Sequence, residues 1–296
     1  MKKRVITGAI LSVVAGTLIY FGGVYFAVVA LVCICFALSE EYKAIRGAGY
    51  HPVAEPTWVA LGISIPLALS FGHMVVVPIL MGASLVTIGA VIFRGLQDQW
   101  AAAEAKPQDE SQEESPEPHP DNRILDAVMS LLPLYSIVLP GLAIISLTQI
   151  SPLSVQRVML LMLIAVPVVG DTTALFVGRA IGGPKLCPAV SPKKTWSGAI
   201  GGLVGSVIAA LLIRLIAGFI CAPTTELPRW VLCCAIGLLG GIAAQLGDLF
   251  ASMVKRHCGI KDFSEIFPGH GGMLDRLDSI LFMSIVLYCC RLLFFA

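Results

Sequence analysis

The sequence predicts an all-α, polytopic integral membrane protein with about nine transmembrane helices. Of its 296 residues, 57% are hydrophobic and 13% are charged, about half the charged fraction of a soluble domain. The apolar residues are gathered into runs, several of which reach the length of about 20 residues that a spanning helix needs. Lysine and arginine concentrate between alternate runs, as they do in the cytoplasmic loops of membrane proteins.

The expected spans follow these runs in order along the chain. The first run, Val5–Leu38, is too long for one helix, and Gly22-Gly23 provides a tight turn that divides it into two. The third span is short, and only Gly72 separates it from the fourth. The later spans are expected at Thr57–Phe71, His73–Phe93, Ile124–Leu147, Val158–Phe176, Gly198–Ile220, Trp230–Ala251 and Ser279–Phe295.

The N-terminal sequence Met1-Lys2-Lys3-Arg4 before an apolar run imitates a signal peptide. The apolar stretch nevertheless continues to Leu38 without a cleavage-like site that leads into a polar mature domain. We therefore interpret it as a first span with a cytoplasmic anchor. The nine cysteines lie mostly inside apolar runs and are expected to act as small hydrophobic side chains.

The distribution of cations supports nine helices with a cytoplasmic N-terminus. If the spans alternate from that start, sixteen of the twenty Lys and Arg residues fall on the cytoplasmic side, and only Arg157 and Arg229 fall in loops on the far side. A wrong helix count would scramble this division. We expect a multi-pass protein of the inner (cytoplasmic) membrane.

A polar segment interrupts the apolar runs and suggests how the chain is divided. Gln97–Asn122 is rich in Pro, Gln, Ser and acidic residues, with a single lysine, so it cannot bury a core and is predicted to be disordered. The predicted regions are an N-terminal four-helix part (1–94), an acidic cytosolic linker (95–122) and a C-terminal five-helix part (123–296). No internal repeat supports an inverted-repeat transporter.

Two carboxylates lie at membrane depth. Asp171 follows Pro167-Val168-Val169-Gly170, and Asp248 lies in Gln245-Leu246-Gly247-Asp248. A charged residue inside a span costs at least ~2.5–3.5 kcal/mol on insertion scales, so it marks a functional site by default. The alternative for each is a helix-end carboxylate that reaches the cytoplasmic interface.

The segment Ser252–Asp278 offers three kinds of groups for phosphate chemistry. Its cations can bind phosphate, arginine through a bidentate fork. The turn Gly269–Gly272 lets backbone N–H groups approach an anion. Asp275 and Asp278 lie one helical turn apart and suit Mg²⁺. The cations of this segment are Lys255, Arg256, Lys261 and Arg276.

A second basic loop, Ser191–Gly198, lies on the same predicted membrane face and contributes Lys193 and Lys194, with Trp196 at interface depth. A lysine pair alone is usually only a topology signal. Opposite a basic, glycine-rich and carboxylate-bearing loop, we interpret it as a phosphate clamp. Together the residues predict metal-assisted chemistry on a highly phosphorylated substrate at the edge of the bilayer.

The stretch Ser252–Asp278 resembles the signature of the phosphatidate cytidylyltransferase (CDP-diacylglycerol synthase) family. The pattern Ser-x-apolar-Lys-Arg-x4-Lys-Asp, then Pro-x-His-Gly-Gly-x2-Asp-Arg-x-Asp, is matched throughout. The Ser-Pro-Lys-Lys-Thr-Trp element and the intramembrane Gly-Asp pairs are also similar to that family. The resemblance covers about 165–280, and it departs at Ser197, where the family usually has Glu.

The resemblance implies transfer of a cytidylyl group from CTP to phosphatidate, giving CDP-diacylglycerol and pyrophosphate, with Mg²⁺ and with room for a second cation. It implies as partners CTP, phosphatidate and the lipid bilayer, with no nucleic acid, and it leaves a homodimer open. The implied metal residues are Asp171, Asp248, Asp275 and Asp278, with Asp248, Asp275, Lys255 and Arg276 as catalytic residues. The implied substrate-binding residues are Lys193, Lys194, Arg256, Lys261, His270, Gly271 and Gly272, with a structural hydrogen bond as the alternative role of His270.

Two other function classes remain as alternatives. A CTP-dependent lipid kinase of the polyprenol or dolichol type would transfer the terminal phosphoryl group to an alcohol, and it would release CDP instead of pyrophosphate. An ion-coupled transporter could carry intramembrane Asp, but it would not need a cluster of cytoplasmic cations beside a glycine turn.

Overall fold

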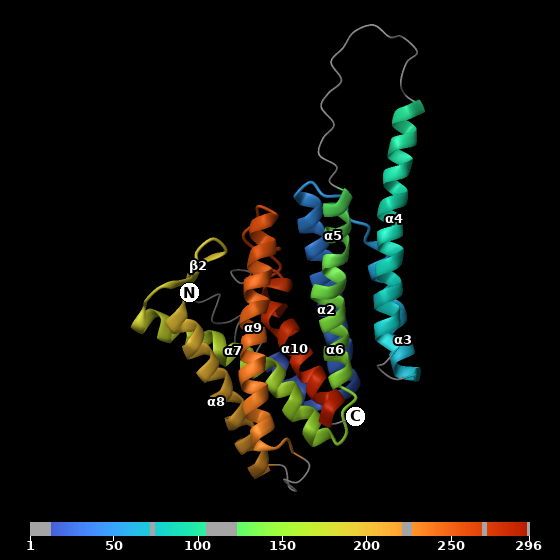
Figure 1. The fold of residues 1–296 in the computed structure, drawn as a ribbon. Helices are drawn as coiled ribbons and strands as arrows, with labels where there is room; N and C mark the ends of the chain where they lie inside the picture. Colours follow the sequence, from blue (N-terminus) through green and yellow to red (C-terminus); the bar gives the residue numbers. More distant parts are fainter. Residues whose placement is uncertain (1–12, 72–74, 105–122, 221–226, 268–270, 295–296) are drawn as a thin grey trace. The chain divides into compact units, whose positions relative to one another are not determined.

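The computed structural model describes residues 13–71, 75–104, 123–220, 227–267 and 271–294 (Figure 1). Within them the chain is almost entirely helical, so the predicted all-α membrane fold is confirmed. Residues 13–21 are also helical. The further helices are α2 (Gly23–Gly47), α3 (Glu55–Phe71), α4 (Val76–Glu104), α5 (Arg123–Pro133), the π-helix η2 (Leu134–Val138), α6 (Leu139–Leu147), α7 (Leu153–Ile181), α8 (Trp196–Ile220), α9 (Trp230–His257) and α10 (Leu274–Phe294).

Seven helical segments in the described residues are long and apolar enough to cross a membrane. They correspond to expected spans two and four to nine, with residues 123–147 counted as one continuous segment. The short third span is α3, which has 17 residues. The first span is described only from residue 13 on, and Gly72 lies outside the described residues. Gly22 and Gly23 have φ of 60° and 48° at the expected turn, a backbone region that glycine adopts without strain.

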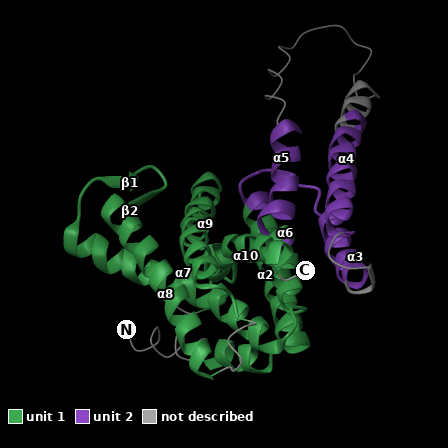
Figure 2. Cartoon of the chain, turned by 60° about the horizontal axis from the view of Figure 1, so that its bottom comes forward, with its two compact units in different colours: residues 1–44, 139–296 green, residues 45–138 purple. Residues whose placement is uncertain are grey.

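The chain forms two compact units, residues 1–44 with 139–296, and residues 45–138 (Figure 2). In the first unit α7 packs along α8, α8 along α9 and α9 along α10, and α10 also contacts α6. The first unit therefore combines most of α2 with the C-terminal helices. The second unit holds α3, α4, α5 and η2, with Val53 N–H donating to Ser130 Oγ at 2.9 Å.

Several helices are longer than the apolar runs from which the membrane spans were expected. α4 continues to Glu104, so residues 97–104 of the predicted disordered segment are helical, and residues 105–122 lie outside the described residues. Extending a formed helix through Leu, Gln, Trp and Ala needs no new nucleus, and three of these four are good helix formers. α9 likewise continues to His257, which places Lys255 and Arg256 in its last turn. Cations are favourable there because the C-terminal end of a helix carries partial negative charge.

Two short strands interrupt the helices in the part of the chain that the structure describes. Lys185–Cys187 (β1) and Ser191–Thr195 (β2) pair as an antiparallel hairpin between α7 and α8, with Lys185 opposite Thr195. The sequence alone predicts a plain loop here. The hairpin ends at Thr195, whose hydroxyl accepts the Gly198 N–H at 3.1 Å and so caps the start of α8.

Candidate active site

Carboxylates of three helices, α7, α9 and α10, come together in the first unit. Asp171 in α7 and Asp248 in α9 line the same cavity, and Asp278 in α10 lies against α9 beside Asp248, since a Cβ added to Gly247 would be 2.5 Å from the Asp278 carbonyl oxygen. Asp248 also forms an ion pair with Lys194 of β2, with 2.6 Å between Oδ2 and Nζ. The hairpin therefore brings a cation to the carboxylate cluster.

A cavity of about 670 Å³ opens beside this cluster. Asp171 and Asp248 line it together with Gln245, whose amide group is fixed by donating to Ala199 O at 3.0 Å. Four cations from α7 and the hairpin complete its polar lining, so the cavity suits a polyanion. These cations are Arg179, Lys185, Lys193 and Lys194.

The base of the hairpin is held by hydroxyl groups. Ser197 Oγ donates to the carbonyl of Gly182, the residue that follows α7, and is 3.2 Å from Thr195 Oγ1. Ser197, which stands where the resembled family usually has Glu, thus joins the end of α7 to the start of α8. This contact supports the position of the lysines on β2.

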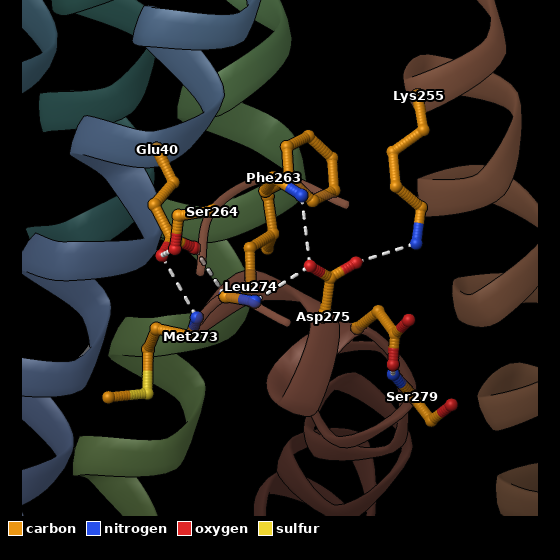
Figure 3. A network of polar contacts seen from close by, with 10 residues as sticks. Glu40, Lys255, Phe263, Ser264, Met273, Leu274, Asp275 and Ser279 are labelled. Atoms are coloured by element: carbon orange, nitrogen blue, oxygen red, sulfur yellow. Dashed lines mark hydrogen bonds and ion pairs between the residues drawn. The ribbon is translucent and has the colours of Figure 1, made fainter. Parts of the chain in front are cut away.

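The segment between α9 and α10 is organised by Asp275 (Figure 3). Its carboxylate is 2.6 Å from Lys255 Nζ and accepts the N–H groups of Phe263 and Gly272, both at 2.9 Å. The Asp275 side chain is only 3% exposed. Oδ1 is thus engaged by Lys255 of α9 and Oδ2 by the segment before α10, and the metal-binding role expected of Asp275 stays a prediction.

A second carboxylate, Glu40 of α2, holds the same segment and was not singled out in the sequence (Figure 3). It is buried, and it accepts the Ser264 hydroxyl together with the N–H groups of Met273 at 3.0 Å and Leu274 at 2.8 Å. The sequence does contain a sign of this role, the acidic pair Glu40-Glu41 directly after an expected membrane span. Carboxylates at membrane depth are rare and usually have a functional or structural partner.

The glycine turn before α10 encloses the protein's own carboxylates. A Cβ added to Gly272 would lie 2.7 Å from both Glu40 oxygens, and one added to Gly271 would lie 2.8 Å from Asp275 Oδ2. Gly271 also has φ of 83°. The Gly272 N–H, expected to face a bound phosphate, donates to Asp275 in this structure.

The other predicted residues divide into those near the cavity and those away from it. Arg276, in the first turn of α10, is exposed, and its charge interacts with Asp171. Arg256 and Lys261 are exposed and are not among the residues that line the cavity. His270 lies outside the described residues. The sequence counted Arg179 and Lys185 only as topology signals, although both line the cavity.

The cluster offers carboxylate oxygens, the kind of ligand that Mg²⁺ takes in proteins. Among the described residues, no three His, Cys, Asp or Glu side chains are arranged as a complete metal cage. Mg²⁺ does not require one, since it usually keeps several waters and takes one or two carboxylates together with substrate phosphates. The Lys194 ammonium on Asp248 already marks a position that favours a cation.

A sequence model of the Cytidylyltransferase family matches residues 2–294. The chain is similar to a phosphatidate cytidylyltransferase of Brucella abortus biovar 1 (strain 9-941), with 48% identity over 118 residues, 40% of this chain and 41% of the relative. It is also similar to one of Bacillus subtilis (strain 168), with 42% identity over 125 residues, 42% of this chain and 44% of the relative. The similarity to one of Rickettsia conorii is 38% over 125 residues, 41% of this chain and 53% of the relative. The chain thus matches about half or less of the length of each of these relatives.

Proposed function

We propose that this chain, which belongs to the cytidylyltransferase family, transfers a cytidylyl group from CTP to phosphatidate and releases pyrophosphate. The single observation that carries the proposal is the cavity whose lining joins four cations to Asp171 and Asp248 at the end of membrane-spanning helices. Such a cavity can take a water-soluble polyanion, while the apolar helices around it give access to a lipid.

The cations of the cavity would bind the triphosphate of CTP. Lys185 and Lys193 are exposed on the hairpin, and Arg179 is exposed near the end of α7. Arginine can grip a phosphate through two parallel N–H bonds, and lysine supplies a mobile point charge. Lys194 forms an ion pair with Asp248 and so neutralises part of its charge.

The reaction joins two anions, so its main demand is charge neutralisation. An oxygen of the phosphatidate phosphate attacks the α-phosphorus of CTP, a new P–O bond forms, and the bond to the β-phosphate oxygen breaks to release pyrophosphate. The second pKa of a phosphate monoester is about 6, so the nucleophile is already ionised at neutral pH. The site therefore needs cations and in-line positioning more than a strong general base.

Mg²⁺ is the proposed cofactor. Asp248 is the proposed main ligand, with Asp171 and Asp278 as further oxygens of the same cluster, because the charges of these three side chains interact. Bound there, the ion would neutralise negative charge on the phosphates and the leaving pyrophosphate. Asp275 would support this site through Lys255 and the segment before α10.

We also propose that the site lies at the cytoplasmic face of the inner membrane, with the N-terminus on the same side. The cavity, the last turn of α9 and the first turn of α10 all carry Lys or Arg. Cytoplasmic segments of membrane proteins are enriched in these residues, and CTP is a cytosolic nucleotide.

The proposal is tested with purified protein, CTP, phosphatidate and Mg²⁺, by measuring pyrophosphate and CDP separately. We expect pyrophosphate only when both substrates are present.

Lys185→Ala and Lys193→Ala should each raise the KM for CTP by roughly tenfold, as loss of a charge-assisted phosphate contact would. Arg94→Ala is the control, because Arg94 lies on α4 in a long, exposed ion pair with Glu55 at 3.9 Å. Release of CDP would instead identify a CTP-dependent lipid kinase.

A further inference from the structure

The first turn of α10 is held from two sides by buried carboxylates. The N–H groups of Met273 and Leu274 donate to Glu40, and that of Gly272 donates to Asp275. The first N–H groups of a helix have no partner within the helix, and negative charge is favourable at that end. Glu40 therefore acts as a cap that a distant part of the chain supplies to α10.

Glu40 also fixes the segment before α10. The Ser264 hydroxyl donates to the same carboxylate, and the neighbouring Phe263 N–H donates to Asp275. A Cβ at Gly272 would come within 2.7 Å of the Glu40 oxygens and 2.8 Å of Ser264 Oγ. Only glycine at position 272 allows Glu40 and Ser264 to come this close, so the contacts of Glu40 depend on that glycine.

The turn that Glu40 caps carries charges of the candidate active site. Arg276 and Asp278 lie two and four residues after Leu274. Asp278 packs against α9 next to Asp248, because a Cβ added to Gly247 would lie 2.5 Å from the Asp278 carbonyl oxygen, and the electrostatic field of Arg276 reaches Asp171. If the first turn of α10 frayed, these side chains would leave their places. Glu40 itself has its oxygens engaged by three donors, which leaves it no direct part in the chemistry.

We infer that Glu40 is a positioning residue, which orders the described residues 263–267 and 271–274 and so places Arg276 and Asp278 at the active site. This role rests on the proposed cytidylyl transfer for its effect on turnover, but its effect on the order of the segment can be measured without turnover. CTP should still bind when Glu40 is changed, because the cations that line the cavity come from α7 and the hairpin.

Amide hydrogen exchange of the full-length protein in detergent tests the ordering directly. Glu40→Gln keeps the shape of the side chain but removes its charge. The new NH₂ group would also face one of the N–H or O–H donors that now bind the carboxylate, so that hydrogen bond would be lost. We expect exchange in residues 271–275 to rise by about tenfold or more, as loss of a charge-assisted bond to a helix start would cause, with no change in α7 and α8. Glu40→Asp should restore part of the protection. Glu265→Gln is the control, because Glu265 lies exposed in the same segment.

Turnover supplies the second readout. Glu40→Gln should lower kcat by about tenfold or more while the KM for CTP changes little, the pattern of an interaction used after substrate binds. Unchanged exchange in residues 271–275 would overturn the inference, whatever the activity. If the wild-type protein formed no CDP-diacylglycerol, the proposed function would fail while the exchange result still decided the role of Glu40.

A second variant covers the case in which Glu40→Gln does not fold. Ser264→Ala removes one donor to Glu40 and should raise exchange in the same residues by a smaller factor. If both variants fold, the double variant should be no worse than Glu40→Gln alone, because the two changes remove the same contact. Additive effects, or a Ser264→Ala protein with wild-type exchange, would contradict the inference.

Discussion

At the scale of single residues, the carboxylates of the site have two different surroundings. Asp248 and Asp171 line the cavity, whereas Asp275 and Glu40 are buried and bind Lys255, the segment before α10 and the start of α10. The sequence could locate Asp171 and Asp248 because a carboxylate inside an apolar run is costly, and Asp275 and Asp278 because they lie one helical turn apart. It could not assign their partners, since Glu40 and Leu274 are separated by 234 residues and meet only through the fold.

The cavity carboxylate is expected to control cation binding. Asp248→Asn keeps the shape of the side chain but removes its charge, so we expect both Mg²⁺ binding and turnover to be lost. The measurement is Mg²⁺-dependent CDP-diacylglycerol formation at equal protein amounts, together with direct Mn²⁺ binding. Glu55→Gln, a change in the exposed ion pair on α3, is the control. A rate above about a tenth of wild type would mean that the substitution raises the activation free energy by less than ~1.4 kcal/mol. That is too small an effect for the loss of a metal ligand and would contradict the assignment.

The buried ion pair is expected to behave as a unit. The side chains of Lys255 and Asp275 are only 13% and 3% exposed, and removing one partner of such a pair typically costs about 3–5 kcal/mol. Asp275→Asn and Lys255→Met should therefore each lower the unfolding temperature clearly, and the double variant should recover part of the loss. Thermal unfolding in detergent measures this. Simple addition of the two losses would show that the pair is not coupled.

At the scale of elements, hydropathy predicted where helices cross the bilayer but not where they end. The apolar run that ends at Ala251 continues as helix to His257, because the last turns of α9 reach beyond the apolar layer and are stabilised there by cations near the helix end. α10 starts at Leu274 instead of Ser279 for a related reason, since its cap comes from Glu40. The three-residue and five-residue strands of the hairpin are too short to leave a period-two pattern.

The helices of the first unit approach each other closely enough to require glycine. A Cβ at Gly237 of α9 would lie 2.6 Å from the Cα atom of Val207 and 3.0 Å from the carbonyl oxygen of Ser206, both in the backbone of α8. Backbone atoms cannot yield as a side-chain end can, so Gly237→Ala should lower the free energy of unfolding by about 1–3 kcal/mol, as overpacking does.

The matched control for this prediction is Gly82→Ala in α4, where an added Cβ would meet no atom within 4 Å. Alanine also favours helix more than glycine does, so this variant should be as stable as wild type or slightly more stable. Denaturant unfolding in the same detergent compares the two proteins. Equal stability of Gly237→Ala and Gly82→Ala would show that α8 and α9 do not pack this closely.

At the scale of the whole molecule, the distribution of cations predicts the orientation in the membrane. Sixteen of the twenty Lys and Arg residues fall on one side if nine segments alternate from a cytoplasmic N-terminus. Reporter fusions at residues 110 and 296 should therefore report opposite sides of the membrane. The same side for both would contradict nine crossings, and a cytoplasmic signal at 296 with an external one at 110 would invert the orientation.

The central claim concerns which phosphorus atom of CTP is attacked, and labelled CTP tests it most directly. With phosphatidate and Mg²⁺ present, label on the α-phosphate should enter the lipid fraction as CDP-diacylglycerol, and label on the γ-phosphate should appear as pyrophosphate. Both should depend on phosphatidate and should be lost in Asp248→Asn. Entry of the γ-label into lipid, with release of CDP, would contradict cytidylyl transfer.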